Sequence, residues 1–258
     1  MENRLLEKLE KGEHVFGISF MEFASAGWPT TFANCGFDFL FIDMEHSTLS
    51  METIGKITWA CRAAGISPII RVPEAQRHFI SRVLDAGAHG FIVPRVETVE
   101  QVENAIAFGL FPPQGERSIS ASGRHFDLAR PDNIEEATQK LNKQTMIGVQ
   151  IETKKGLENI DKLLEHPLID MVFTGPSDMA LTLGIPHDPR HPEVQAAFEK
   201  IIHTALKYGH IPGMQALNVD FSKEMIQKGM RFVVCGAAIS LIRRYGSEIV
   251  NELREFTK

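Results

Sequence analysis

Eight short runs of apolar residues recur along this chain, each followed by a segment long enough for a helix and two turns. This alternation is typical of a parallel sheet with helical crossovers. Runs such as FDFLFID (residues 37–43) are almost continuously apolar, as expected for strands covered on both sides. Eight such strands predict closure into a (β/α)8 barrel. The predicted strands are His14–Phe20, Phe37–Glu45, Pro68–Val72, Gly90–Val96, Met146–Glu152, Met171–Thr174, Ile211–Gln215 and Arg231–Gly236.

Segments with helical spacing lie between these runs, and several end beside glycine, the usual residue after a helix C-terminus. Met1–Lys11 predicts an extra helix on the barrel floor, and Ala237–Phe256 predicts a long final helix. Phe111–Asp132 is too long for an ordinary connection and indicates a functional loop. The other predicted helices are Met51–Ala64, Arg77–Ala86, Val99–Phe108, Leu157–Leu164, Val194–Tyr208 and Ser222–Lys228.

The length of 258 residues is usual for one barrel, so we expect a single domain over residues 1–258. A formal net charge of -6 gives no general attraction to phosphate backbones or anionic lipid, which disfavours nucleic acid and membrane partners. The N-terminal residues lack the apolar stretch of a signal peptide, so we expect a cytoplasmic protein. Cys35, Cys61 and Cys235 are odd in number and widely spaced, which predicts reduced core thiols.

Polar residues gather at the ends of the predicted strands. In barrels of this type the active site lies at the C-terminal face, so such residues are candidates for chemistry. Strands five and six are neighbours in the predicted order, which brings the acids that follow them together. The candidates are Asp43, His46, Arg71, Arg95, Gln150, Glu152, Ser177, Asp178 and Gln215.

Glu152 and Asp178 predict a metal site. Two adjacent carboxylates repel unless they share a proton or a cation, and oxygen ligands with open positions suit Mg²⁺ or Mn²⁺. The alternative is that either acid pairs with an arginine or that Asp178 caps a helix.

His46 follows Asp43 by three residues, so Asp43 is expected to orient the imidazole and leave its other nitrogen free as a base. A purely structural histidine is the alternative. Arg71 follows an apolar run and needs an anionic partner when buried, either a substrate carboxylate or enolate oxygen, or Glu45 or Glu152. The GPSD turn (residues 175–178) offers backbone N–H groups to a carboxylate.

Taken together, these residues and their surroundings resemble the HpcH/HpaI class II aldolases, also called the aldolase/citrate lyase family, which includes 4-hydroxy-2-oxoheptanedioate and 2-dehydro-3-deoxyglucarate aldolases. The resemblance covers nearly the whole chain. It rests on FDFLFIDMEH (37–46), IIRV (69–72), VLDAGAHGFIVPRVETVEQV (83–102), FPPQGERS (111–118), GVQIET (148–153), FTGPSDMALTLG (173–184) and HPEVQ (191–195).

The resemblance implies a lyase that reversibly cleaves a 4-hydroxy-2-oxo acid to pyruvate and an aldehyde through a metal-stabilised pyruvate enolate. It implies Mg²⁺, Mn²⁺ or Co²⁺ on two acids, an arginine at the enolate oxygen, and an acid and histidine pair that moves the proton of the aldol hydroxyl. It also implies a hexamer built from dimers that exchange the last helix. The implied positions are Glu152 and Asp178 for the metal, Arg71 for the enolate, Asp43 and His46 for the proton, and Gln150 with the Ser177 and Asp178 amides for pyruvate.

Arg95 and Gln215 depart from the family pattern, where apolar residues are common, and we expect Arg95 to favour an acceptor aldehyde with an extra carboxylate. These departures leave open an alternative reaction known among relatives of the family, a metal-free condensation of oxaloacetate with acetyl-CoA to citrate. The alternative from another functional class is a non-catalytic barrel that only binds a metabolite.

Overall fold

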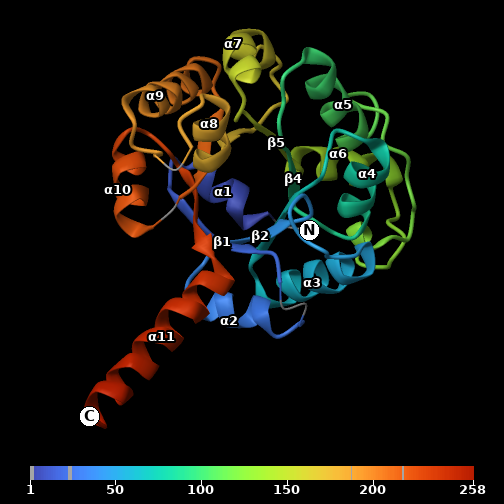
Figure 1. Ribbon diagram of the computed structural model, residues 1–258. Helices are drawn as coiled ribbons and strands as arrows, with labels where there is room; N and C mark the ends of the chain where they lie inside the picture. The colour runs from blue at the N-terminus through green and yellow to red at the C-terminus, as the bar shows by residue number, and fades with distance from the viewer. Residues whose placement is uncertain (1–2, 23–24, 187, 217) are drawn as a thin grey trace.

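The computed structural model describes residues 3–22, 25–186, 188–216 and 218–258. Its eight strands form one closed parallel barrel in sequence order, which confirms the predicted (β/α)8 fold (Figure 1). The strands are β1 (Val15–Phe20), β2 (Phe39–Asp43), β3 (Ser67–Arg71), β4 (Gly90–Val93), β5 (Met146–Gln150), β6 (Met171–Thr174), β7 (Ile211–Gln215) and β8 (Phe232–Ala237).

Four strands end earlier than the sequence predicted: β3 ends one residue early, at Arg71, and Glu45, Arg95 and Glu152 lie in the loops that follow β2, β4 and β5. The apolar pattern of the sequence continues past the ends of these strands because residues of the loops are also buried, and Val96 and Ile151 are fully enclosed. Ile151 still donates its backbone N–H to Phe173 at 2.8 Å. Burial that continues past the ends of the strands therefore made the strands look longer than they are.

The helices surround the barrel (Figure 1). The sequence did not predict α2, α6 or α8: α2 and α8 have only seven residues each, and α6 is mostly polar with Thr138 and Leu141 as its buried residues. The helices are α1 (Arg4–Glu10), α2 (Trp28–Asn34), α3 (Met51–Ala64), α4 (Arg77–Asp85), α5 (Val99–Gly109), α6 (Ile134–Gln144), α7 (Lys154–Leu163), α8 (Pro176–Thr182), α9 (Pro192–Lys207), α10 (Val219–Gln227) and α11 (Ala238–Phe256), with a 3-10 turn at Arg124–Phe126.

Phenylalanines fill the interior of the barrel. The rings of Phe39 and Phe232 stack with centroids 4.0 Å apart, and those of Phe41 and Phe173 lie 5.3 Å apart. Leu5 and Leu9 of α1 join the same buried cluster, so α1 covers the N-terminal end of the barrel. Because the interior is packed, a site for small molecules has to lie at one of the ends.

The irregular segment Phe111–Asp132 lies against α3 and α4. Arg62 near the end of α3 donates to the Arg124 carbonyl at 2.8 Å and pairs with Asp127. Asp85, the last residue of α4, pairs with buried Arg117 at 2.7 Å. Helices in this barrel run back towards the N-terminal ends of the strands, so these contacts anchor the loop far from the C-terminal rim of its own barrel.

Helix α11 extends away from the barrel (Figure 1). Ala238 is its one buried residue among those described. The helix nevertheless carries large exposed apolar side chains, namely Ile239, Ile242, Tyr245, Ile249, Val250, Leu253 and Phe256. No helix in the described ranges is long and apolar enough to cross a membrane.

The three cysteines are free, as predicted, but they are not all in the core. Cys61 is buried and Cys235 is half-buried, whereas Cys35 is exposed. The core assignment of Cys35 was wrong because the residue ends α2, where the chain turns at the surface.

Candidate active site

A cavity of about 240 Å³ opens at the C-terminal ends of the strands. Residues from β2, β3, β7, α8 and the loops between them meet there, although they are far apart in the sequence. The lining residues are Met21, Asp43, His46, Arg71, Gly175, Pro176, Ser177, Asp178, Gln215 and Ala216.

Arg71, at the end of β3, is only 5% exposed and pairs with two acids. Its Nε donates to Asp43 Oδ1 at 2.9 Å and its Nη2 to Asp43 Oδ2, while Nη1 lies 3.2 Å from Glu45 Oε2. Burial opposes the positive charge, but the hydrogen bonds and negative charges of Asp43 and Glu45 outweigh it and raise the pKa of Arg71. Arg71 is therefore a fixed cation at the wall of the cavity.

The structure differs from the predicted contact between the Asp43 and His46 side chains. Asp43 Oδ1 accepts the backbone N–H groups of Glu45 at 3.0 Å and His46 at 3.4 Å, and Arg71 occupies the rest of the carboxylate. The His46 imidazole instead has its Nε2 3.7 Å from Glu45 Oε2. The expected orientation of the ring by Asp43 was wrong, because the backbone and Arg71 use both carboxylate oxygens.

Glu45 is a site residue that the sequence analysis considered only as a partner of Arg71. It lies between Arg71 and His46 and touches both. The signal in the sequence was an acid next to His46 at a strand end. The side chain of His46 is 55% exposed and lines the cavity, so the ring is open to a bound molecule.

Glu152 is 2% exposed and both of its carboxylate oxygens are held. Oε1 accepts the backbone N–H of Arg95 at 3.1 Å, and Oε2 accepts the side-chain amide of Gln150. Burial, followed by the negative charges of Asp178 and Glu45, raises the pKa of Glu152 to about 7. A cation placed beside Glu152 would offset both effects.

Gly175 borders a small space beside Glu152. A Cβ at this position would lie 2.9 Å from Glu152 Oε2, 3.3 Å from Gln150 Nε2 and 3.5 Å from Asp178 Oδ2. The carboxylates of Glu152 and Asp178 therefore face one small space, which the missing side chain of Gly175 keeps open.

The residues around this space fit a hard divalent cation. They supply two carboxylate oxygens, and Mg²⁺ is commonly held by one or two carboxylates with the remaining positions taken by water or substrate. Within the described ranges no group of three or more His, Cys, Asp or Glu residues that could hold a metal ion is found, so Glu152 and Asp178 are two ligands rather than a complete set.

Arg95 lies just beyond β4 with a left-handed backbone, φ 50°. Its N–H binds Glu152 and its carbonyl accepts from Gln101 Nε2 at 3.3 Å, so the unusual conformation is held from both sides. The side chain is exposed and does not line the cavity, whereas Gln215 does. Arg95 thus stands at the rim and Gln215 within the cavity.

Gln150 is fully buried and lies beside Glu152, outside the cavity lining. Its Oε1 has no hydrogen-bond partner among the described residues. Ser177 and Asp178 are in the first turn of α8, where backbone N–H groups lack acceptors within the helix. The turn presents these groups next to the space at Gly175.

Comparison with known proteins assigns this arrangement to a family. Residues 18–244 match the family model HpcH/HpaI aldolase/citrate lyase. A relative named hydroxypyruvate/pyruvate aldolase from Roseobacter denitrificans is 32% identical over 254 residues, covering 98% of each chain. A solved HpcH/HpaI aldolase from Desulfitobacterium hafniense DCB-2 is 28% identical with a TM-score of 0.93, covering 97% of this chain and 96% of the other.

A solved structure of the citrate synthase SbnG is also similar, at 26% identity and a TM-score of 0.88, with 98% of this chain and 99% of the other covered. The match to the family model spans far more than half of the chain. The named aldolase relative is matched over nearly its full length. This chain therefore belongs to the HpcH/HpaI aldolase/citrate lyase family, and it is an enzyme of the carbon–carbon lyase class.

Proposed function

We propose that this enzyme is a class II aldolase that uses a divalent cation to cleave a 4-hydroxy-2-oxo acid reversibly into pyruvate and an aldehyde. The observation that carries the proposal is the space at Gly175, faced by Glu152 and Asp178 and adjoining a cavity that contains Arg71 and His46.

Glu152 and Asp178 would hold Mg²⁺, Mn²⁺ or Co²⁺, and such an ion supplies Lewis acidity next to a 2-oxo acid. Arg71 lies on the same cavity, where its guanidinium stabilises negative charge on the enolate oxygen as the carbon–carbon bond breaks. The amides of Ser177 and Asp178 receive the pyruvate carboxylate, and Gln150 holds Glu152 in place.

His46 is proposed to move the proton of the aldol hydroxyl. Its Nε2 faces Glu45, which leaves Nδ1 for the substrate or a bridging water. Asp43 contributes indirectly, because it fixes the backbone at His46 and orients Arg71.

Metal dependence provides the decisive experiment. Purified enzyme is incubated with pyruvate and a panel of aldehydes that includes succinic semialdehyde, glycolaldehyde and tartronate semialdehyde. We expect aldol products that disappear with EDTA and return with Mg²⁺, Mn²⁺ or Co²⁺. Activity that is undiminished after complete removal of divalent metal would rule out the proposed role of Glu152 and Asp178.

Arg95 is proposed to select acceptors with a second carboxylate, because its guanidinium is exposed at the rim while its backbone binds Glu152. Arg95→Met should lower the kcat/KM ratio of acidic to neutral aldehydes by about tenfold, equivalent to one charge-assisted hydrogen bond. Gln215→Leu serves as a comparison, since it removes polarity inside the cavity without removing charge. An unchanged ratio in Arg95→Met would remove Arg95 from substrate selection.

Condensation of oxaloacetate with acetyl-CoA to citrate is the second candidate, favoured by the similarity to citrate synthase SbnG. Release of free CoA from these two substrates, unaffected by EDTA, would identify it. Pyruvate formation that requires a divalent metal would identify the aldolase instead.

Assembly into a hexamer of three dimers is also proposed, with exchange of α11 between partners. The exposed apolar side chains of α11 support it, since an isolated helix with such a face is unfavourable in water. Light scattering of the intact chain should give six subunits, and deletion of residues 238–258 should give smaller species. A monomeric intact chain would contradict the assembly.

A further inference from the structure

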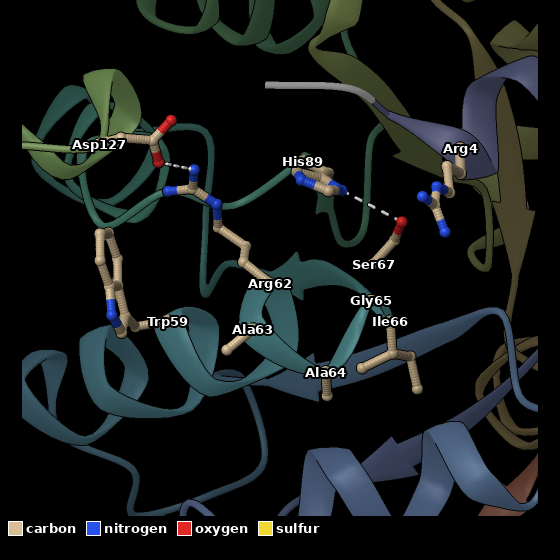
Figure 2. A pocket seen from close by; sticks show the side chains of 10 residues that line it. All are labelled: Arg4, Trp59, Arg62, Ala63, Ala64, Gly65, Ile66, Ser67, His89 and Asp127. Carbon is tan, nitrogen blue, oxygen red and sulfur yellow. Dashed lines mark hydrogen bonds and ion pairs between the residues drawn. The ribbon is translucent and has the colours of Figure 1, made fainter.

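A second cavity lies at the opposite end of the barrel from the proposed active site. It measures about 640 Å³ and opens between α1, the end of α3, the start of β3 and the residue before β4 (Figure 2). We propose that this cavity is a second binding site, which takes a small molecule carrying a phosphate or carboxylate group. The inference does not depend on the proposed reaction. The cavity is lined by Arg4, Trp59, Arg62, Ala63, Ala64, Gly65, Ile66, Ser67, His89 and Asp127.

Two arginines approach the cavity from different elements. Figure 2 shows Arg4 of α1 on one side and Arg62 of α3 on the other, with His89 and Ser67 between them. Among the described residues, the Arg4 guanidinium has no recorded hydrogen bond or ion pair, and its side chain is free to meet a ligand.

Arg62 is fixed more firmly. It donates to the Arg124 carbonyl at 2.8 Å, pairs with Asp127, and lies over the Trp59 ring at 5.1 Å from the ring centre. A guanidinium held by several partners loses little side-chain entropy when a ligand binds beside it.

The charges around the cavity favour an anion. The lining contains two arginines and one acid, Asp127, whose side chain is 60% exposed to water. Burial and then the positive charge of Arg62 lower the pKa of His89 to about 4, so the imidazole is neutral at physiological pH. The cavity therefore has a net positive charge that a phosphate or carboxylate would offset.

His89 supplies a buried polar group that the protein leaves unpaired. The residue is 8% exposed, and its Nδ1 lies 3.1 Å from Ser67 Oγ. Its Nε2 has no partner among the described residues. When the Ser67 hydroxyl donates to Nδ1, the ring proton is on Nε2 and is available as a hydrogen-bond donor. In that tautomer Nε2 is a buried donor without an acceptor, and an oxygen of a bound anion would satisfy it.

Ala63, Ala64 and Ile66 also line the cavity, and the Trp59 ring stands at its edge beside Arg62 (Figure 2). The volume also exceeds that of an inorganic ion and lies in the range of sites for small molecules.

The fluorescence of Trp59 allows binding to be observed at this end of the barrel alone. The chain has two tryptophans, so Trp28→Phe leaves Trp59 as the only one. Its fluorescence is followed at constant ionic strength, in protein from which divalent metal and chelator have been removed beforehand, during titration with sodium phosphate or sodium succinate. We expect a saturable change with at least one of the two anions, and the anion that saturates at the lower concentration defines the class.

Arg4→Ala in the same background should raise the half-saturation concentration by at least about tenfold, as expected for loss of one charged contact. Arg82→Ala is the matched control, because Arg82 is exposed on α4 and outside the cavity lining. No saturable change with either anion, or equal effects of the two substitutions, would overturn the proposal.

Calorimetric titration of the unsubstituted protein and Arg4→Ala with the same anions provides the test if Trp28→Phe does not fold. Heat of binding that is equal in the two proteins would likewise overturn the proposal. Aldol activity of Arg4→Ala should remain at the wild-type level, since Arg4 is at the other end of the barrel.

Discussion

Replacement of Gly175 by alanine is the sharpest test of the proposed metal site. The backbone at Gly175, with φ -108° and ψ 117°, is one that alanine adopts without strain. The new methyl group would lie 2.9 Å from Glu152 Oε2, well inside ordinary contact distance. The carboxylate must therefore move, although the backbone need not.

The expected size of the effect follows from the contacts of Glu152. Both oxygens are already bound, one by the Arg95 N–H at 3.1 Å and the other by the Gln150 amide. Movement of the carboxylate breaks or weakens one of these charge-assisted hydrogen bonds, worth about 1.5–3 kcal/mol. We expect metal affinity to fall by about 10–150-fold, with a matching fall in aldol activity at limiting metal.

Titration calorimetry with Mn²⁺ measures the metal affinity, and thermal unfolding in EDTA checks the fold. Gly27→Ala is the control, since a methyl group there meets no neighbour closer than 3.8 Å. It should leave metal binding unchanged. Wild-type metal affinity in Gly175→Ala would refute the assignment of the space between Glu152 and Asp178.

The further predictions concern Glu152, Arg71 and His46. Because the pKa of Glu152 is raised to about 7, metal affinity should increase about tenfold per pH unit up to pH 7 and then level off. Mn²⁺ affinities that are the same from pH 5 to pH 8 would contradict this pH dependence. Metal-free protein should lose stability as the pH rises towards 7, since the folded state binds the extra proton, and a thermal unfolding temperature in EDTA that does not fall between pH 5 and 7 would contradict that expectation. Arg71→Leu should lower the free energy of unfolding by about 3–5 kcal/mol by leaving Asp43 buried and unpaired, whereas Arg71→Lys should retain most stability in denaturant titrations but lose about 10²–10³-fold in kcat. Equal stability of the two variants would argue against the ion pair. His46→Ala should slow cleavage of the 4-hydroxy-2-oxo acid by about 10²–10⁴-fold with little change in stability, and cleavage at the wild-type rate would exclude His46 as the group that takes the proton of the aldol hydroxyl.

The sequence determined the barrel because a fold of this kind depends on patterns that are local along the chain. Apolar strands and helical spacing recur along the chain, and several helices are followed by glycines such as Gly65, with φ 74° after α3. Strand order follows from that repetition, so the approach of the residues after β5 and β6 was also predictable. Short or polar helices such as α6 were not, since few of their residues are buried.

Only the tertiary structure decided how the site residues pair. Asp43 turned out to bind Arg71 and the backbone, and His46 to face Glu45, because side-chain partners depend on distances that sequence spacing does not specify. The space at Gly175 depends on three side chains from β5, the loop after it and α8. Such contacts arise when separate strands close into a barrel, which is why the sequence named the acids while the fold arranged them.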